Sequence, residues 1–168
     1  MSIHCPRMFD IEEIRAQWAK QRPDIDTRPM GLIGRLVRLT ALYSDEMIKN
    51  FAKHGLSAAS FDVLATLLRS GPPHSLSPNQ LLSTMMVTSG TMTNRIDQLV
   101  KDGLVARIPN PDDKRSVHVQ LTEDGIKKID AAVTDHVIVQ RRLVEGLSQA
   151  DQATLNRILD KGLSSFDR

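Results

Sequence analysis

Short polar side chains gather in the middle of the chain, and a basic segment follows them. The hydroxyl and amide groups belong to Ser89, Thr91, Thr93, Asn94 and Gln98. The basic segment is Lys114-Arg115, with Asp113 directly before it. Near a helix N-terminus, hydroxyl and amide groups can contact phosphates or base edges, and the helix dipole favours phosphate. These residue types indicate contact with a nucleic acid.

A helix is expected from about Thr88 to Asp102, with the polar group on one side. Met92, Ile96 and Leu99 recur at the i, i+4, i+7 spacing of a buried helical stripe. Gly103 follows, and glycine ends helices because it adopts a left-handed conformation without a steric penalty. An ordinary amphipathic helix with a solvated polar face would show the same pattern, so the residues that follow decide between these interpretations.

Two strand-like runs come next, 104–109 and 116–121, joined by the tip Asn-Pro-Asp-Asp-Lys-Arg. A helix followed by a two-stranded ribbon with a basic tip is typical of a winged helix-turn-helix. The helix is sized for the major groove of DNA, and the tip can reach the neighbouring minor groove. We therefore predict that double-stranded DNA is contacted by Ser89, Thr91, Thr93, Asn94, Gln98, Asp113, Lys114 and Arg115.

The other segments are expected to form helices around this unit. Helices are predicted over 9–22, 29–54, 58–69 and 78–84, from Thr122 to about 145, and from Ser148 onward. The 29–54 helix has more apolar residues than one stripe needs, which indicates contact with both its own domain and a partner subunit.

The predicted fold class is mainly α with a small β-wing, and it has three parts. Residues 1–55 would form an N-terminal extension and dimerisation helices, and residues 56–122 the winged helix-turn-helix DNA-binding domain. Residues 123–168 would form C-terminal dimerisation helices. A homodimer would supply the two-fold symmetry of a palindromic operator.

Composition restricts the possible classes of function. The chain has 168 residues, of which 40% are hydrophobic, so one domain with a substantial core is expected. It has neither an apolar run of about 20 residues nor an apolar signal-peptide core, so we expect a cytoplasmic protein with no membrane partner. A net charge of +2 suits a local DNA contact, and 4% aromatic residues argue against stacking of single-stranded bases.

An enzyme is not indicated by the sequence. It shows no nucleophile motif, no glycine-rich phosphate loop and no carboxylate pair at a useful spacing, and its five histidines lack the spacing of metal ligands. We therefore expect no cofactor and no metal. A closer alternative is a thiol-based redox sensor, because Cys5 lies near His4 and Arg7, which favour the thiolate. A ligand-independent winged helix, binding DNA or only another protein, is a further alternative.

The run from Gly90 to Gly125 resembles the MarR family of bacterial transcription regulators. The resemblance is carried by Gly-Leu-Val-x-Arg after the helix and by the Asp-x-Arg signature of the tip, here Asp113-Lys114-Arg115. It implies that Arg115 enters the minor groove and that Asp113 braces its guanidinium. From the residues alone, two alternatives stay open: Asp113 as a turn-forming residue and Arg115 as a solvated charge.

A narrower resemblance is to the urate-responsive, PecS-like branch of this family. It is carried by Ile-Arg-Ala-Gln-Trp near the N-terminus, by Pro-Met-Gly at 29–31, and by Phe-Asp-Val-Leu at 61–64. The resemblance implies a repressor that is released from its operator by a small planar anion such as urate or xanthine. It also implies a ligand site made of Trp18, Asp62, Arg95 and Arg107.

The residues themselves are compatible with such a site. Asp62 lies in an apolar helix, where a carboxylate needs a partner, and Arg95 flanks the buried stripe of the following helix. The resemblance implies that a planar anion competes with Asp62 for Arg95 and shifts the DNA-reading helix. Other interpretations stay open: Trp18 as a packing anchor, the Asp62–Arg95 pair as a structural brace, and Arg95 and Arg107 as phosphate contacts.

Overall fold

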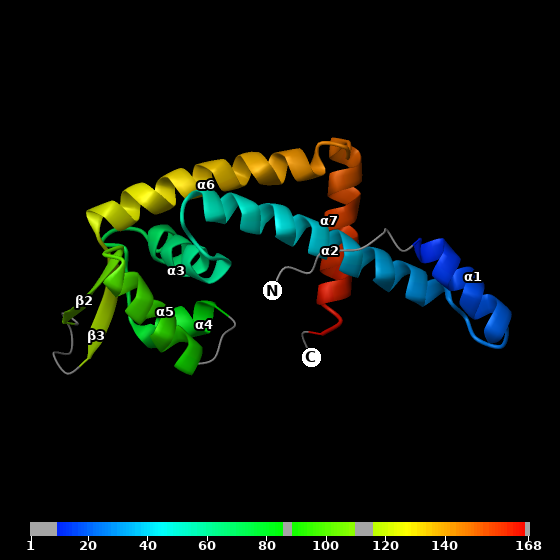
Figure 1. The fold of residues 1–168 in the computed structure, drawn as a ribbon, viewed down its shortest axis with the longest axis horizontal. Helices are drawn as coiled ribbons and strands as arrows, with labels where there is room; N and C mark the ends of the chain where they lie inside the picture. Colours follow the sequence, from blue (N-terminus) through cyan, green and yellow to red (C-terminus); the bar gives the residue numbers. More distant parts are fainter. Residues whose placement is uncertain (1–9, 86–88, 110–115, 167–168) are drawn as a thin grey trace. The chain divides into compact units, whose positions relative to one another are not determined.

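A computed structural model describes residues 10–85, 89–109 and 116–166. In chain order the elements are α1 (Ile11–Gln21), α2 (Arg28–Lys53), α3 (Ala58–Arg69), β1 (Ser75–Leu76), α4 (Pro78–Thr84), α5 (Ser89–Lys101), β2 (Val105–Pro109), β3 (Val117–Leu121), α6 (Glu123–Val144) and α7 (Gln149–Leu163) (Figure 1). The predicted fold class, mainly helical with a small β-wing, is confirmed.

The chain divides into two compact units, residues 1–45 and 46–168, with the boundary inside α2. In the first unit Asp10 caps α1, because its side chain accepts a hydrogen bond of 2.9 Å from the backbone N–H of Glu12. Glu12 forms ion pairs with Arg15 of α1 and with Arg35 of α2. These charges connect the two helices of the first unit.

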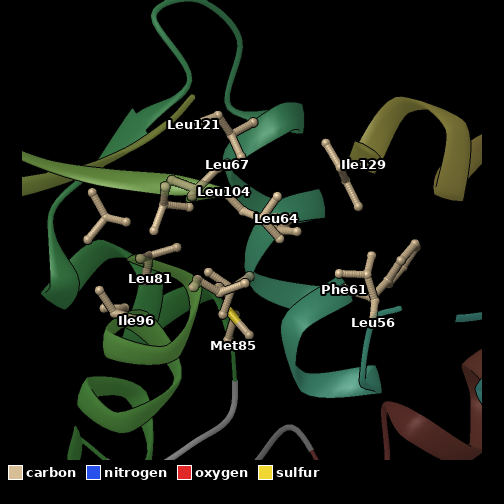
Figure 2. Close-up of a cluster of buried hydrophobic side chains, with 14 of the residues drawn as sticks. Leu56, Phe61, Leu64, Leu67, Leu81, Met85, Ile96, Leu104, Leu121 and Ile129 are labelled. Carbon is tan, nitrogen blue, oxygen red and sulfur yellow. The ribbon is translucent and has the colours of Figure 1, made fainter. Parts of the chain in front are cut away.

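The apolar core lies in the second unit and fixes the rotation of α5. Met92, Ile96 and Leu99 are only 1%, 2% and 0% exposed, which confirms the predicted stripe. They belong to the same buried cluster as Leu64 and Leu67 of α3 (Figure 2). The core therefore holds α5 against α3 by one face and leaves its other face for contacts outside the unit.

Local signals determine most helix ends. The Ser77 side chain accepts from the backbone N–H of Gln80, and the Gln80 side chain accepts from that of Ser77, so a capping box starts α4. Gly103 has a φ of +72°, the left-handed conformation expected after α5. α2 begins at Arg28, one residue before the predicted start, because the Asp26 side chain accepts from the backbone N–H of Arg28.

The sheet contains three antiparallel strands in the order β1-β3-β2. The predicted ribbon is β2 paired with β3, from Val105 opposite Leu121 to Pro109 opposite Val117. The sequence prediction missed β1, which pairs Ser75 with Gln120. A strand of two residues is too short to show an alternating pattern, and only its partner β3 gives it a regular conformation.

The start of α6 is joined tightly to the wing. The Thr122 hydroxyl donates to the backbone carbonyl of Gly103 at 2.8 Å and accepts from the backbone N–H of Gly125 at 3.0 Å. An ideal Cβ on Gly125 would lie 3.0 Å from the carbonyl carbon of Leu104 and even closer to its oxygen. Since both groups are backbone, neither can move aside without shifting the helix or the strand.

We expect Gly125→Ala to lower the free energy of unfolding by about 1–3 kcal/mol, because the new methyl group overlaps the Leu104 carbonyl. Urea denaturation followed by circular dichroism measures this change. Gly162→Ala in α7 is the matched control, because its Cβ would meet nothing within 4 Å. Alanine there should be neutral or stabilising by roughly 0.5–1 kcal/mol. Equal stability of the two variants would contradict the proposed close approach at Gly125.

Candidate nucleic-acid interface and small-molecule pocket

The outward face of α5 carries the polar side chains predicted to contact DNA. Thr93, Asn94 and Gln98 are exposed, whereas Met92 beside them is buried. Gln98 donates a hydrogen bond of 2.8 Å to the Asp102 carboxylate one turn further along. The core thus turns these short polar groups outward, as a helix that enters the major groove requires.

Several predicted contact residues lie outside what the structure describes. The backbone of α5 includes Ser89 and Thr91, but their side chains are not among the described ones. The tip residues Asp113, Lys114 and Arg115 and the thiol of Cys5 also lie outside the described residues. Their roles stay predictions from the sequence.

An ion pair connects the wing to α5. The Nη2 atom of Arg107 on β2 lies 2.5 Å from the Oδ1 atom of Asp97 on α5. The Arg107 and Asp97 side chains are 41% and 53% exposed, and a pair this open to solvent contributes roughly 0–1 kcal/mol to stability. Its main effect is geometric, because it holds the wing strand and the helix in one arrangement.

A pocket of about 380 Å³ lies between α3 and the end of α4. Its α3 wall includes Asp62, Thr66 and Arg69, and Thr84 and Met85 follow from α4. Phe61 and Ala65 complete the apolar part of the lining. Of the four predicted ligand residues, Asp62 lines this pocket, while Arg95 and Arg107 are not among its lining residues.

The Asp62 carboxyl has a distinct electrostatic environment. Burial raises its pKa above the usual range, and the positive charges of Arg95, Arg69 and His136 oppose this rise. Among the described residues, no hydrogen bond or ion pair joins Asp62 to Arg95. Arg95, the partner that we expected for the carboxylate, therefore acts on it only at longer range. Asp62 lies on a partly solvated side of α3, so water reaches the carboxylate.

His136 of α6 belongs to an aromatic cluster that shares Phe61 with this pocket. The rings of Phe51 and Phe61 are stacked with centroids 4.1 Å apart, and the imidazole lies 5.1 and 5.0 Å from them. Burial lowers the pKa of His136, with the charge of Asp62 opposing the shift. Burial thus disfavours the charged imidazole, whereas Arg95 and Arg69 are permanent positive charges acting on Asp62.

Trp18, the fourth predicted ligand residue, belongs to the first unit, whereas the other three belong to the second. It lies on α1, and its side chain is 44% exposed, so packing within the first unit does not cover the indole. A partly uncovered indole offers a flat apolar surface to a planar molecule.

Within residues 10–85, 89–109 and 116–166, no group of three or more His, Cys, Asp or Glu side chains is arranged to hold a metal ion. In the same ranges, no helix is both long enough and apolar enough to cross a membrane.

Sequence reasoning missed two residues of this region, Arg69 in the pocket and Asp97 as the partner of Arg107. The spacing from Asp62 to Arg69 is seven residues, or two helical turns, which places both on one side of α3. This spacing could have predicted that Arg69 lies beside Asp62. No pattern in the sequence could have predicted the pairing of Asp97 with Arg107, because the turn between α5 and β2 determines it.

We expect Asp62→Asn to become relatively more stable than the wild-type chain as the pH rises. The folded-state pKa of Asp62 is raised, so its contribution to stability is complete below the unfolded-state pKa and is lost as pH rises through the folded value. Asparagine has no such loss. Urea denaturation at several values between about pH 3 and pH 7 measures the difference.

Glu46→Gln is the control of opposite sign for this experiment. The Lys49 ammonium that hydrogen-bonds Glu46 lowers the pKa of that carboxyl, so its contribution is present above the unfolded pKa and is lost on acidification. This variant should therefore become relatively less stable as the pH rises. The same trend for both variants would contradict the raised pKa at Asp62.

Comparison with known proteins places these features in a family. The MarR family profile matches residues 56–117, which run from just before α3 to the first residue of β3. The HTH-type transcriptional regulator PecS of Dickeya dadantii is 37% identical over 155 residues, which cover 92% of this chain and 93% of that protein.

Two solved structures have a similar fold. One is a MarR mutant from E. coli complexed with operator DNA, with a TM-score of 0.69 and 26% identity, covering 87% of this chain and 97% of that one. The other concerns BpsR of Bordetella bronchiseptica, whose DNA binding is regulated by 6-hydroxynicotinic acid. Its TM-score is 0.66 at 25% identity, and it covers 77% of this chain and 91% of that one. From its sequence, its winged helix-turn-helix and these relatives, which are regulators and not enzymes, the chain belongs to the MarR family of DNA-binding transcriptional regulators.

Proposed function

We propose that this regulator represses transcription from a palindromic operator and is released from it by a small planar anion, with urate or xanthine as the first candidates. The observation that carries the proposal is the pocket wall at Asp62. There a carboxylate with a raised pKa lies under the influence of Arg95, which belongs to the DNA-reading helix. A charge placed in this pocket therefore acts on α5.

The DNA contact has two parts. The exposed Thr93, Asn94 and Gln98 of α5 would lie in the major groove, together with Ser89 and Thr91 of the same helix. Asp113, Lys114 and Arg115 at the tip would reach the minor groove, where a guanidinium suits the electronegative floor. The structure of the E. coli relative with operator DNA supports this assignment by analogy.

Relatives support an anionic effector. PecS has the highest identity among the relatives named above, and BpsR is regulated by 6-hydroxynicotinic acid, which is itself a planar heterocyclic acid. Urate and xanthine have the same combination of a flat ring and ionisable oxygens or nitrogens. The apolar side chains of Phe61, Ala65 and Met85 in the pocket would cover the faces of such a ring.

Release from DNA would follow because the bound anion changes the electrostatic force on Arg95 of α5. An anion next to Asp62 adds a second negative charge near Arg95, so it competes with Asp62 for that guanidinium. The Arg107–Asp97 pair would transmit the resulting shift of α5 to the wing. Effector and operator then oppose each other reciprocally, with a coupling free energy of roughly 1–3 kcal/mol.

We expect Arg95→Ala to bind the operator but to lose its response to urate, because the pocket then no longer acts on α5 through this charge. Fluorescence anisotropy with the labelled DNA upstream of the protein's own gene, at fixed salt with and without urate, measures both properties. Arg115→Ala is the DNA-contact control, and it should weaken operator binding about tenfold or more regardless of urate. If urate failed to release the wild-type protein, the effector would be discarded and the regulator kept.

We also propose that a second copy of the chain covers the apolar helices. Eight large apolar side chains of α2 are exposed: Met30, Leu32, Ile33, Leu36, Val37, Leu39, Leu42 and Ile48. α6 adds Val137 and Ile138, and α7 adds Ile158, Leu159 and Leu163. Exposed apolar surface of this extent marks a protein–protein interface, and a two-fold dimer would match a palindromic operator.

Size-exclusion chromatography with light scattering should give twice the 18.7 kDa mass of one chain. Leu159→Glu should shift the protein towards monomer, because it places a carboxylate among the exposed apolar residues of α7. Ala153→Glu on the same helix is the matched control and should remain dimeric. A wild-type mass of one chain at micromolar concentration would exclude the dimer.

A further inference from the structure

The pocket between α3 and α4 contains a guanidinium that the family resemblance does not assign. Arg69 lies two helical turns after Asp62, on the same side of α3, and both line the pocket. Thr66 lies between them and is only 4% exposed. The Nη2 atom of Arg69 donates a hydrogen bond of 3.3 Å to the Thr66 hydroxyl, which holds the guanidinium along the pocket wall.

The charged groups around the pocket have a net positive charge that one anion would neutralise. Asp62 contributes one carboxylate, and Arg69 and Arg95 are the two arginines whose charges act on it. Burial lowers the pKa of His136 and so disfavours its charged form. The local sum is therefore positive, and a monoanion would neutralise it. If Arg95 were the sole cation near Asp62, an anion in the pocket would have to share the positive charge of Arg95 with the Asp62 carboxylate.

Arg107 is in a different situation. Its guanidinium is bound by Asp97 at 2.5 Å, ten residues earlier in the chain, and the described lining of the pocket does not include it. An effector bound there would have to share this guanidinium with the Asp97 carboxylate. Among the described residues, no carboxylate forms an ion pair with Arg69. Its guanidinium donates instead to the neutral hydroxyl of Thr66.

We propose that Arg69 supplies the guanidinium that binds the anionic edge of the effector, whereas Arg107 is a positioning residue that braces the wing against α5. This assignment rests on the proposed function. The effector would direct its anionic edge to Arg69 and an N–H edge to the Asp62 carboxylate, with its ring face against Met85 and Ala65. The pocket would thus select a planar heterocycle that accepts at one edge and donates at the other.

The test is calorimetric titration of the full-length protein with urate, in the absence of DNA. Arg69→Gln removes the charge but keeps a polar N–H donor, and Arg107→Gln makes the same chemical change at the brace. We expect Arg69→Gln to weaken urate binding about tenfold or more, since a charge-assisted hydrogen bond is lost, and Arg107→Gln to change it less than about threefold. Arg69→Lys should bind with intermediate affinity, because it keeps the charge but not the planar fork.

Folding and the proposed function are checked separately. Operator binding of Arg69→Gln without urate should equal that of wild type, which shows that the variant is folded. If wild-type protein binds neither urate nor xanthine, the purine effector fails and the Arg69 assignment fails with it. If wild type binds but Arg69→Gln binds equally well, or if Arg107→Gln loses as much affinity as Arg69→Gln, the assignment alone is overturned.

Discussion

The burial of one apolar stripe on α5 against α3 is the constraint on which the rest of this molecule depends. Met92, Ile96 and Leu99 are almost completely buried, and each such side chain contributes about 1.5–3 kcal/mol when it leaves water. Because these residues must point inward, Thr93 and Asn94 must point outward. The same packing that stabilises the domain therefore determines which side chains the helix presents to DNA.

Because α3 packs against α5, a ligand bound at α3 is well placed to control the position of the DNA-reading helix. α3 contributes Leu64 and Leu67 to the core on one side and Asp62 and Arg69 to the pocket on another. A charge that enters the pocket acts on a helix in direct contact with α5. Packed interiors resist gradual deformation. When α3 shifts against α5, the two helices therefore change to a second discrete packing arrangement and do not move by a continuous series of small steps. The proposed release from DNA requires only that effector and operator prefer different arrangements.

The wing is tied to the helices at two places. Near its middle, the Arg107–Asp97 pair holds β2 to α5, and at its base Thr122 and Gly125 hold α6 to the end of α5 and the start of β2. α6 also carries exposed apolar residues that a second copy would cover. A movement of α5 is thereby linked to the wing, and the wing to the proposed dimer helices, so that major-groove and minor-groove contacts would change together.

The sequence by itself determined the features that depend on near neighbours along the chain. The caps at Ser57, Ser77, Thr122 and Ser148 and the left-handed Gly103 follow from bonds within a few residues, and the α5 stripe follows from helical periodicity. The winged helix-turn-helix and the family were accessible for the same reason, since their pattern is a succession of local signals.

Only the tertiary structure decided which distant side chains meet. β1 exists because β3 lies beside it, Arg107 faces Asp97 because of the turn after α5, and Arg69 joins Asp62 in a pocket that the end of α4 closes. Among the described residues, no arginine bonds Asp62 directly, although its apolar helix had suggested such a partner. Such pairings depend on how packed helices are rotated about their axes. That rotation is determined by the whole core, and no short stretch of sequence contains it.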